Sequence, residues 1–237
     1  MNIKTVIDQI ECFAPLEYQE PYDNSGVQVG DFQQEVKGAL LCVDITEEVV
    51  DEAIAKGCNL VISHHPLLFH AIKKITPDNY INRCVIKAIK NDIVLYSCHT
   101  NIDKVKNGVS FRIAEKLGVR MVKLLAQDPQ NPNIGLGIVG ELDKEQTLKD
   151  FLSRTKSVTG IKAIRYTPAP LEKKIKRVEL CGGSGHEFLA DAIKEKADIY
   201  LTADLKYPDF FNTEGKIILA DIGHFESEQF TKEIFYD

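Results

Sequence analysis

Two copies of a strand–helix–strand pattern occur in the sequence, and this repeat limits the folds that the chain can adopt. In the first copy, residues 37–69, one apolar strand is expected at 39–43 and another at 60–62. Thr46 is a suitable N-cap for the helix between them, because its hydroxyl can accept a hydrogen bond from the first turn. The second copy begins at residue 176 and has the same order of elements. At one constant offset, the aligned pairs are Cys42 with Cys181, Val50 with Leu189, Ala53 with Ala192, Ile54 with Ile193, Ile62 with Leu201 and Ser63 with Thr202.

A second correspondence follows each copy. The strand-like segment DIVLYSC leads into His99-x-x-x-Asp103, and the segment KIILADIG leads into His224-x-x-x-Glu228. Two matches in the same order favour an α/β fold made of two related units with mainly parallel or mixed sheets. In such sheets, functional groups collect at the carboxyl ends of the strands.

The repeat also predicts the domain boundaries. The first α/β unit is expected at 1–125, with a C-terminal helix at about 225–237 packing near it, and the second unit at 126–224. Residues 121–140 contain the sequence DPQNPN and a Gly-Leu-Gly run, so this stretch is expected to be the linker between the units.

The composition indicates a soluble protein of the cytoplasm. The chain has 237 residues, of which 44% are hydrophobic, so it can bury a core of ordinary size. The sequence contains neither a signal-peptide core nor an apolar run long enough to span a membrane. The six cysteines have no disulfide-scaffold spacing, which favours reduced thiols. The net charge of −6 disfavours nucleic acid as a partner.

Two adjacent histidines give the strongest indication of a metal site. The apolar strand at 60–62 runs into His64 and His65, and Pro66 stops the strand from simply continuing. Neighbouring side chains on an extended chain point to opposite sides, so each imidazole could face a different ion of a pair. The alternative is a polar turn with stacked or solvated imidazoles.

Acidic residues and a further histidine complete the candidate set. We expect Asp103 to be a ligand, because the loop before the helix near residue 109 can direct its carboxylate into a cleft. His224 and Glu228 lie four residues apart at the start of a helix, so both can face one site. His99 remains open, as a ligand, a hydrogen-bonding neighbour of the site or an interior histidine. The predicted metal ligands are His64, His65, Asp103, His224 and Glu228, in the cleft between the two units.

Three imidazoles and two carboxylates suit two divalent ions such as Zn, Mn, Fe or Co better than Mg or Ca. Five protein ligands leave each ion of the pair with open positions, where bound water can become a nucleophile near neutral pH. Hydrolysis is therefore the favoured reaction class. The loop Cys181-Gly182-Gly183-Ser184-Gly185 is either an anion cradle or a tight turn. Asp204, which aligns with His65 in the repeat, is a further candidate for the cleft lining.

Motifs along the whole chain carry a resemblance to a known family. The segments PYDNSGVQVG, ISHHPLLF, HTNIDKVKNGVS, CGGSG, YLTADLKY and ADIGHFESE occur in this order, as in the GTP cyclohydrolase I type 2 homologs, and the chain resembles their short form. The resemblance implies a dinuclear metal centre with the same five ligands, Glu228 bridging both ions, and a toroidal homo-hexamer. The chain departs from many members in having Tyr22 where Trp is common, and Tyr207-Pro208 where a Tyr-His pair is common.

The sequence thus predicts a metal-dependent hydrolase that acts on a nucleotide or another phosphorylated small molecule. The alternative is a non-enzymatic, ring-shaped assembly that binds metal or serves as a scaffold for a partner. The catalytic proton donor is not identified by any motif.

Overall fold

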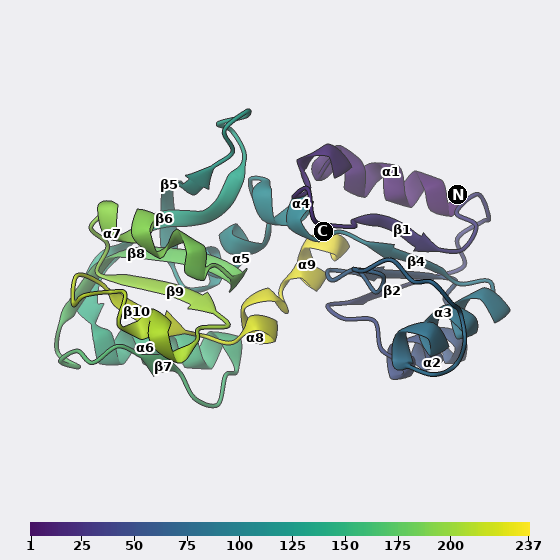
Figure 1. Ribbon diagram of the computed structural model, residues 1–237. Helices are drawn as coiled ribbons and strands as arrows, with labels where there is room; N and C mark the ends of the chain where they lie inside the picture. The colour runs from purple at the N-terminus through teal and green to yellow at the C-terminus, as the bar shows by residue number, and fades with distance from the viewer. The chain divides into compact units, whose positions relative to one another are not determined.

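Two α/β units make up the chain in the computed structural model, which describes residues 1–237 (Figure 1). Unit 1 contains Met1–Ile102 and Thr231–Asp237, and unit 2 contains Asp103–Phe230. Each unit has its own mixed sheet with helices packed on it. The predicted α/β fold class, with two units and mixed sheets, is therefore confirmed.

The sheet of unit 1 has the strand order β1-β4-β3-β2, in which β2, β3 and β4 are parallel and β1 is antiparallel. Figure 1 shows α1 on one face of this sheet and α2 and α3 on the other. Both central strands are buried along their full length, as expected for a sheet covered on both faces. The elements are α1 (Ile3–Phe13), β1 (Gly26–Val29), β2 (Ala39–Cys42), α2 (Glu47–Ala55), β3 (Leu60–Ser63), α3 (Tyr80–Lys90), β4 (Val94–Ser97) and α9 (Thr231–Tyr236), with a 3-10 turn at Leu16–Tyr18.

Parallel register in unit 1 places the candidate residues at one edge of the sheet. Cys42 of β2 pairs with Ser63 of β3, and Ser63 pairs with Ser97 of β4. The three strands therefore end at the same level, and the residues that follow them emerge side by side. Thr46 caps α2 as predicted, since its side chain accepts a hydrogen bond from the Val49 N–H.

The sheet of unit 2 has the order β5-β6-β8-β9-β10-β7, with β8, β9 and β10 parallel and the other pairs antiparallel. Buried residues of α5 and α6 share one hydrophobic core with one face of the sheet, and those of α7 share another core with the opposite face. The elements are α5 (Val109–Lys116), β5 (Val119–Gln127), β6 (Gly135–Thr147), α6 (Leu148–Thr159), β7 (Arg165–Tyr166), β8 (Lys174–Ser184), α7 (Leu189–Lys194), β9 (Ile199–Ala203), β10 (Ile218–Asp221) and α8 (His224–Glu228), with 3-10 turns at His186–Phe188 and Tyr207–Phe210. The short helix α4 (Thr100–Lys104) spans the boundary between the units.

The predicted linker at 121–140 is wrong. This stretch is a β-hairpin in which Met121 of β5 pairs with Gly140 of β6, and the DPQNPN sequence lies in its connecting loop. The Gly and Pro residues mark the hairpin turn rather than a break between units. Because α5 and β5 pack within unit 2, the boundary lies at residues 102/103 rather than near 125.

The C-terminal segment also divides differently from the expected helix at 225–237. It forms two short helices, of which α8 belongs to unit 2 and α9 to unit 1. None of the helices in the chain combines the length and the apolar character that a membrane span requires.

Glu179 of β8 is an acidic residue inside the core of unit 2. Its side chain is fully buried, neither carboxylate oxygen has a hydrogen-bond partner, and its neighbours in the sheet are Val139 and Tyr200. Burial raises the pKa of Glu179 to about 8, and the negative charge of Glu195 adds to the effect. Glu179 is therefore held as a neutral acid in the folded chain at neutral pH.

This burial predicts a loss of stability as the pH rises. In the unfolded chain the pKa of this carboxyl is near its usual value of 4.5. Between pH 4.5 and about pH 8 the unfolded chain has therefore lost this proton while the folded chain still holds it, so a rise in pH favours the unfolded state. At about 1.4 kcal/mol per pKa unit, the free energy of unfolding should fall by at most roughly 5 kcal/mol across this range. Glu179→Gln should flatten the fall, as denaturant unfolding at about pH 5 and pH 8 would measure. Glu145→Gln, at an exposed position of β6, is the matched control, and an equally steep fall in Glu179→Gln would contradict the prediction.

Candidate metal centre

Three histidines lie together at the carboxyl ends of β3 and β4 in unit 1. His64 and His65 directly follow β3, and His99 follows β4 by two residues. One ligating atom from each side chain lies within 4.8 Å of those of the other two. The ring centroids of His64 and His65 are 4.8 Å apart, and each is 5.3 Å from the centroid of His99. We call these three residues the three-histidine cluster.

Each ring of the cluster is oriented by a hydrogen bond at Nδ1. His64 Nδ1 lies 3.0 Å from the Cys98 carbonyl oxygen. His65 Nδ1 lies 2.7 Å from an Asp44 carboxylate oxygen, and His99 Nδ1 lies 2.8 Å from an Asp23 carboxylate oxygen. An oxygen acceptor at one ring nitrogen is the usual arrangement for a metal-binding histidine, because it fixes the tautomer and directs the other nitrogen to the ion.

Asp23 is the more deeply embedded of the two supporting carboxylates. Its side chain is fully buried and accepts hydrogen bonds from the backbone N–H groups of Asn24, at 2.7 Å, and Thr100, at 3.0 Å. Burial alone would raise its pKa, but the hydrogen bond and positive charge of His99, with the hydrogen bond from Thr100, hold the pKa of Asp23 well below its usual range. Asp23 is therefore an anion that can fix His99 in place.

The interaction of Asp44 with His65 gives a test of this arrangement. Asp44→Ala removes the acceptor at His65 Nδ1, so the ring loses its fixed orientation and Zn²⁺ should bind roughly 10- to 100-fold more weakly. Competition with a chromophoric chelator would measure the affinity. Asp51→Ala, which removes an exposed carboxylate of α2 that pairs with Lys87, should leave the affinity unchanged. Equal affinities in the two variants would show that Asp44 does not support a metal ligand.

In unit 2, His224 and Glu228 begin and end α8. The His224 Nε2 and a Glu228 carboxylate oxygen are 3.1 Å apart, as the shared helix face predicts. Asp204, which follows β9, places a carboxylate oxygen 2.7 Å from His224 Nδ1. The hydrogen bond to Glu228 raises the pKa of His224 to about 9, burial opposes it, and Asp204 adds to the rise. A metal ion that binds Nε2 must therefore displace a proton.

The glycine segment Cys181–Gly185, of which Cys181–Ser184 form the end of β8, supports Glu228 rather than an anion. A Cβ atom on Gly183, which has a φ of +65°, would lie 2.1 Å from Glu228 Oε1, so the carboxylate packs where a side chain would be. The interpretation as an anion cradle is wrong, because the N–H groups that would bind an anion donate to protein hydroxyls. The Gly182 N–H donates to the Ser110 hydroxyl (3.2 Å), the Gly183 N–H to the Ser227 hydroxyl (2.9 Å) and the Gly185 N–H to the Thr202 hydroxyl (2.9 Å).

The remaining predicted ligand, Asp103, lies in α4, four residues after His99, and is half-buried. Sequence reasoning missed the carboxylates of Asp23 and Asp44. A signal existed for Asp44, because it directly follows an expected strand that runs parallel to the one before His65. No comparable signal marked Asp23, since it reaches His99 from a loop distant in the sequence.

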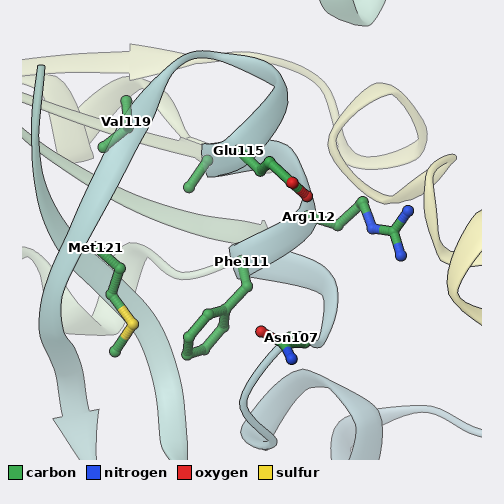
Figure 2. A pocket seen from close by; sticks show the side chains of 7 residues that line it. Asn107, Phe111, Arg112, Glu115, Val119 and Met121 are labelled. Carbon is green, nitrogen blue, oxygen red and sulfur yellow. The ribbon is translucent and has the colours of Figure 1, made fainter. Parts of the chain in front are cut away.

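A pocket of about 440 Å³ in unit 2 is made by other residues. It is lined by Asn107, Phe111, Arg112, Ala114, Glu115, Val119 and Met121. Figure 2 shows the Phe111 ring beside the Met121 side chain, with the Arg112 guanidinium extending away from them. None of these seven residues is a predicted ligand, so the pocket is separate from the candidate ligand set.

The side chains present in each unit fit divalent metal ions. In unit 1, His64 and His65 have Nδ1 held by oxygen acceptors. In unit 2, His224 is held in the same way, and Glu228 adds a buried carboxylate beside it. This mixture of nitrogen and oxygen donors is typical of sites for Zn, Mn, Fe or Co.

Comparisons with known proteins agree with the predicted resemblance. The profile of the Duf34/NIF3 (NGG1p interacting factor 3) family matches residues 1–237. The "GTP cyclohydrolase 1 type 2 homolog" of Clostridium perfringens is 40% identical over 231 residues, which cover 96% of this chain and 87% of that protein. The protein of the same name from Streptococcus pneumoniae is 34% identical over 238 residues, which cover 99% of this chain and 89% of that protein.

Solved structures show the same fold. A hypothetical protein of Staphylococcus aureus has a TM-score of 0.91 at 28% identity, covering 100% of this chain and 89% of its own. Reduced HcgD from Methanocaldococcus jannaschii has a TM-score of 0.83 at 29% identity, covering 99% of this chain and 92% of its own. The likeness extends over both units, and the chain belongs to the Duf34/NIF3 family.

Proposed function

We propose that the chain is a metal-dependent hydrolase that acts on a nucleotide or another phosphorylated small molecule. Two divalent ions, of Zn, Mn, Fe or Co, are bound by His64, His65, Asp103, His224 and Glu228. The observation that carries this proposal is the hydrogen bonding of the histidines: His64, His65 and His224 all have Nδ1 held by an oxygen acceptor, in the manner of metal-binding imidazoles.

When bound, such ions polarise a substrate oxygen and lower the pKa of a water molecule. The protein's own residues provide the orientation. Asp44 and Asp204 hold His65 and His224 in fixed orientations, and Gly183 leaves the space that the Glu228 carboxylate occupies. His99, held by Asp23, is the third member of the three-histidine cluster, and it can donate a hydrogen bond to a ligand or accept one from it.

The substrate class is supported by the relatives. Proteins 34–40% identical to this chain bear the name "GTP cyclohydrolase 1 type 2 homolog", which points to a nucleotide. By the same resemblance we propose a homo-hexamer in the cytoplasm. The acidic net charge of −6 continues to disfavour nucleic acid as a partner.

The test compares turnover by two isosteric variants. The intact, metal-loaded assembly is incubated with GTP, other nucleotides and simple phosphoesters, and product release is measured. Glu228→Gln should lower turnover by roughly 100-fold or more, because a bound ion supplies several kcal/mol of transition-state stabilisation. Glu226→Gln, two residues away, should retain activity. If the wild-type protein turns over none of these compounds while binding metal, the non-enzymatic, ring-shaped assembly replaces the hydrolase as the better account.

A further inference from the structure

Two exposed aromatic side chains lie beside the three-histidine cluster in unit 1. Tyr22 is 63% exposed and Phe69 is 38% exposed. Their ring centroids are 6.5 Å apart, and the Phe69 centroid is 6.2 Å from that of His99, with the two rings nearly perpendicular. The rings of Tyr22, Phe69 and His99 therefore form a continuous row that ends at the histidines.

The backbone that carries this row is fastened on both sides. Asn24 donates a hydrogen bond of 2.7 Å from its side-chain amide to the Leu68 carbonyl. The Leu68 N–H donates to the side-chain oxygen of Gln28 at 3.1 Å. Tyr22 directly precedes Asp23, whose carboxylate is bonded to His99. The two aromatic residues are thus held at the site by their immediate neighbours, although solvent reaches both rings.

Exposed aromatic rings held next to polar, ligating groups are a common feature of small-molecule sites. The apolar faces of such rings gain most from a flat, polarisable partner, which covers a ring face and stacks on it, whereas a phosphate would leave the rings in water. The row is therefore suited to a ligand with a planar ring at one end and a polar group at the other.

We propose that Tyr22 and Phe69 form a stacking surface for the nucleobase ring of the substrate, with the polar part of the substrate directed to the three-histidine cluster. Because the planes of the two rings are tilted by 60°, the base stacks on one ring and meets the other with its edge. This inference rests on the proposed function and narrows its substrate class to molecules that carry a planar heteroaromatic ring. Tyr22 and Phe69 then select the substrate, while the proposed metal ligands hold the ions with which it would react.

The chain contains no tryptophan, so Tyr22→Trp provides a single fluorescent reporter within the stacking surface. The full chain, loaded with Zn²⁺, is titrated with GMP, AMP, CMP and UMP, and with ribose 5-phosphate as the ligand that lacks a base. At least one nucleotide should quench the fluorescence saturably, and ribose 5-phosphate should not. Tyr80→Trp, at an exposed tyrosine of α3, should show no saturable quenching.

Adding Phe69→Ala to Tyr22→Trp should weaken nucleotide binding by roughly 10- to 100-fold, the range expected for loss of one stacked ring. Bound metal and oligomeric state should not change. The proposal is overturned if no nucleotide quenches Tyr22→Trp, if Phe69→Ala leaves the affinity unchanged, or if Phe69→Ala dissociates the assembly, since the ring would then be a contact between copies. If nucleotides bind but are not turned over, the hydrolase proposal fails and the stacking surface stands. If ribose 5-phosphate is turned over and no nucleotide quenches the fluorescence, the stacking surface fails and the hydrolase proposal stands.

Discussion

Replacing His64 and His65 together by alanine is expected to abolish high-affinity binding of divalent metal to the chain. Each imidazole is oriented at Nδ1 by a protein oxygen, and the double variant removes two of the three imidazoles among the five proposed ligands. Losing an orienting partner alone typically costs about 10- to 100-fold in metal affinity, so losing two ligands should cost more than roughly 100-fold. Elemental analysis of protein purified without chelator, followed by a Zn²⁺ titration, would measure the loss.

His70→Ala is the matched control for this variant. His70 lies on the segment that follows His64 and His65, but it is exposed and lies outside the clusters of potential ligands. The His70→Ala variant should bind metal with the same affinity as the wild-type chain. If the double variant keeps its metal while remaining folded, the two histidines form a polar turn, which is the alternative that the sequence left open.

Gly183→Ala is expected to weaken metal binding by displacing Glu228 of unit 2, without changing a ligand. The added Cβ would lie 2.1 Å from Glu228 Oε1 and 3.4 Å from His224 Nε2. No such contact can persist, so the Glu228 carboxylate must move, and metal affinity should fall by roughly tenfold or more. The strand end itself cannot easily move away, because the Gly183 N–H donates a hydrogen bond to the Ser227 hydroxyl.

The backbone strain of this substitution has a control of its own. Gly160 has a φ of +74°, close to that of Gly183, and a Cβ atom there would have no neighbour within 4 Å. Gly160→Ala and Gly183→Ala should both lose about 1 kcal/mol of stability from the left-handed backbone, as measured by denaturant unfolding. A fall in metal affinity confined to Gly183→Ala would identify the displaced carboxylate as the cause, and equal affinities would contradict the role of Glu228.

The sequence predicted most reliably what depends on apolar strands and their ends. The strand before His64 and His65 is buried along its length, so its apolar run and its abrupt end at Pro66 were both visible. Parallel pairing then placed His99 near them, since Ser63 and Ser97 are partners in the sheet. The helix cap at Thr46 was also predictable, because an N-cap hydrogen bond joins residues that are close in the sequence.

Long-range contacts were not predictable in this way. Asp23 reaches His99 from a loop that contains no regular element, and its spacing in the sequence indicates nothing about the contact. The Gly and Pro residues of 121–140 indicate a turn equally well within a hairpin or between units, and only the pairing of β5 with β6 distinguishes them. The glycine segment at the end of β8 was ambiguous in the sequence, because only the structure locates the hydroxyl partners of its N–H groups.

The repeat predicted the position of Asp204 but not its role. It aligns with His65, a proposed ligand, yet its carboxylate lies 2.7 Å from His224 Nδ1 and serves that ring as Asp44 serves His65. In both units an aspartate after one strand supports a histidine after the neighbouring parallel strand, but relative to the repeat the pair in unit 2 is shifted by one strand. This shift explains why the alignment set Asp204 against His65 and could not assign the function of either side chain.

Anomalous X-ray diffraction from crystals of the whole chain, purified without chelator, tests the central claim most directly. The proposed function predicts two anomalous peaks per chain, at roughly 2.0–2.3 Å from ligand atoms of His64, His65, Asp103, His224 and Glu228, with Glu228 touching both ions. Crystals that contain no bound ion at these residues after soaking in Zn²⁺ and Mn²⁺, or ions bound only by other side chains, would contradict it.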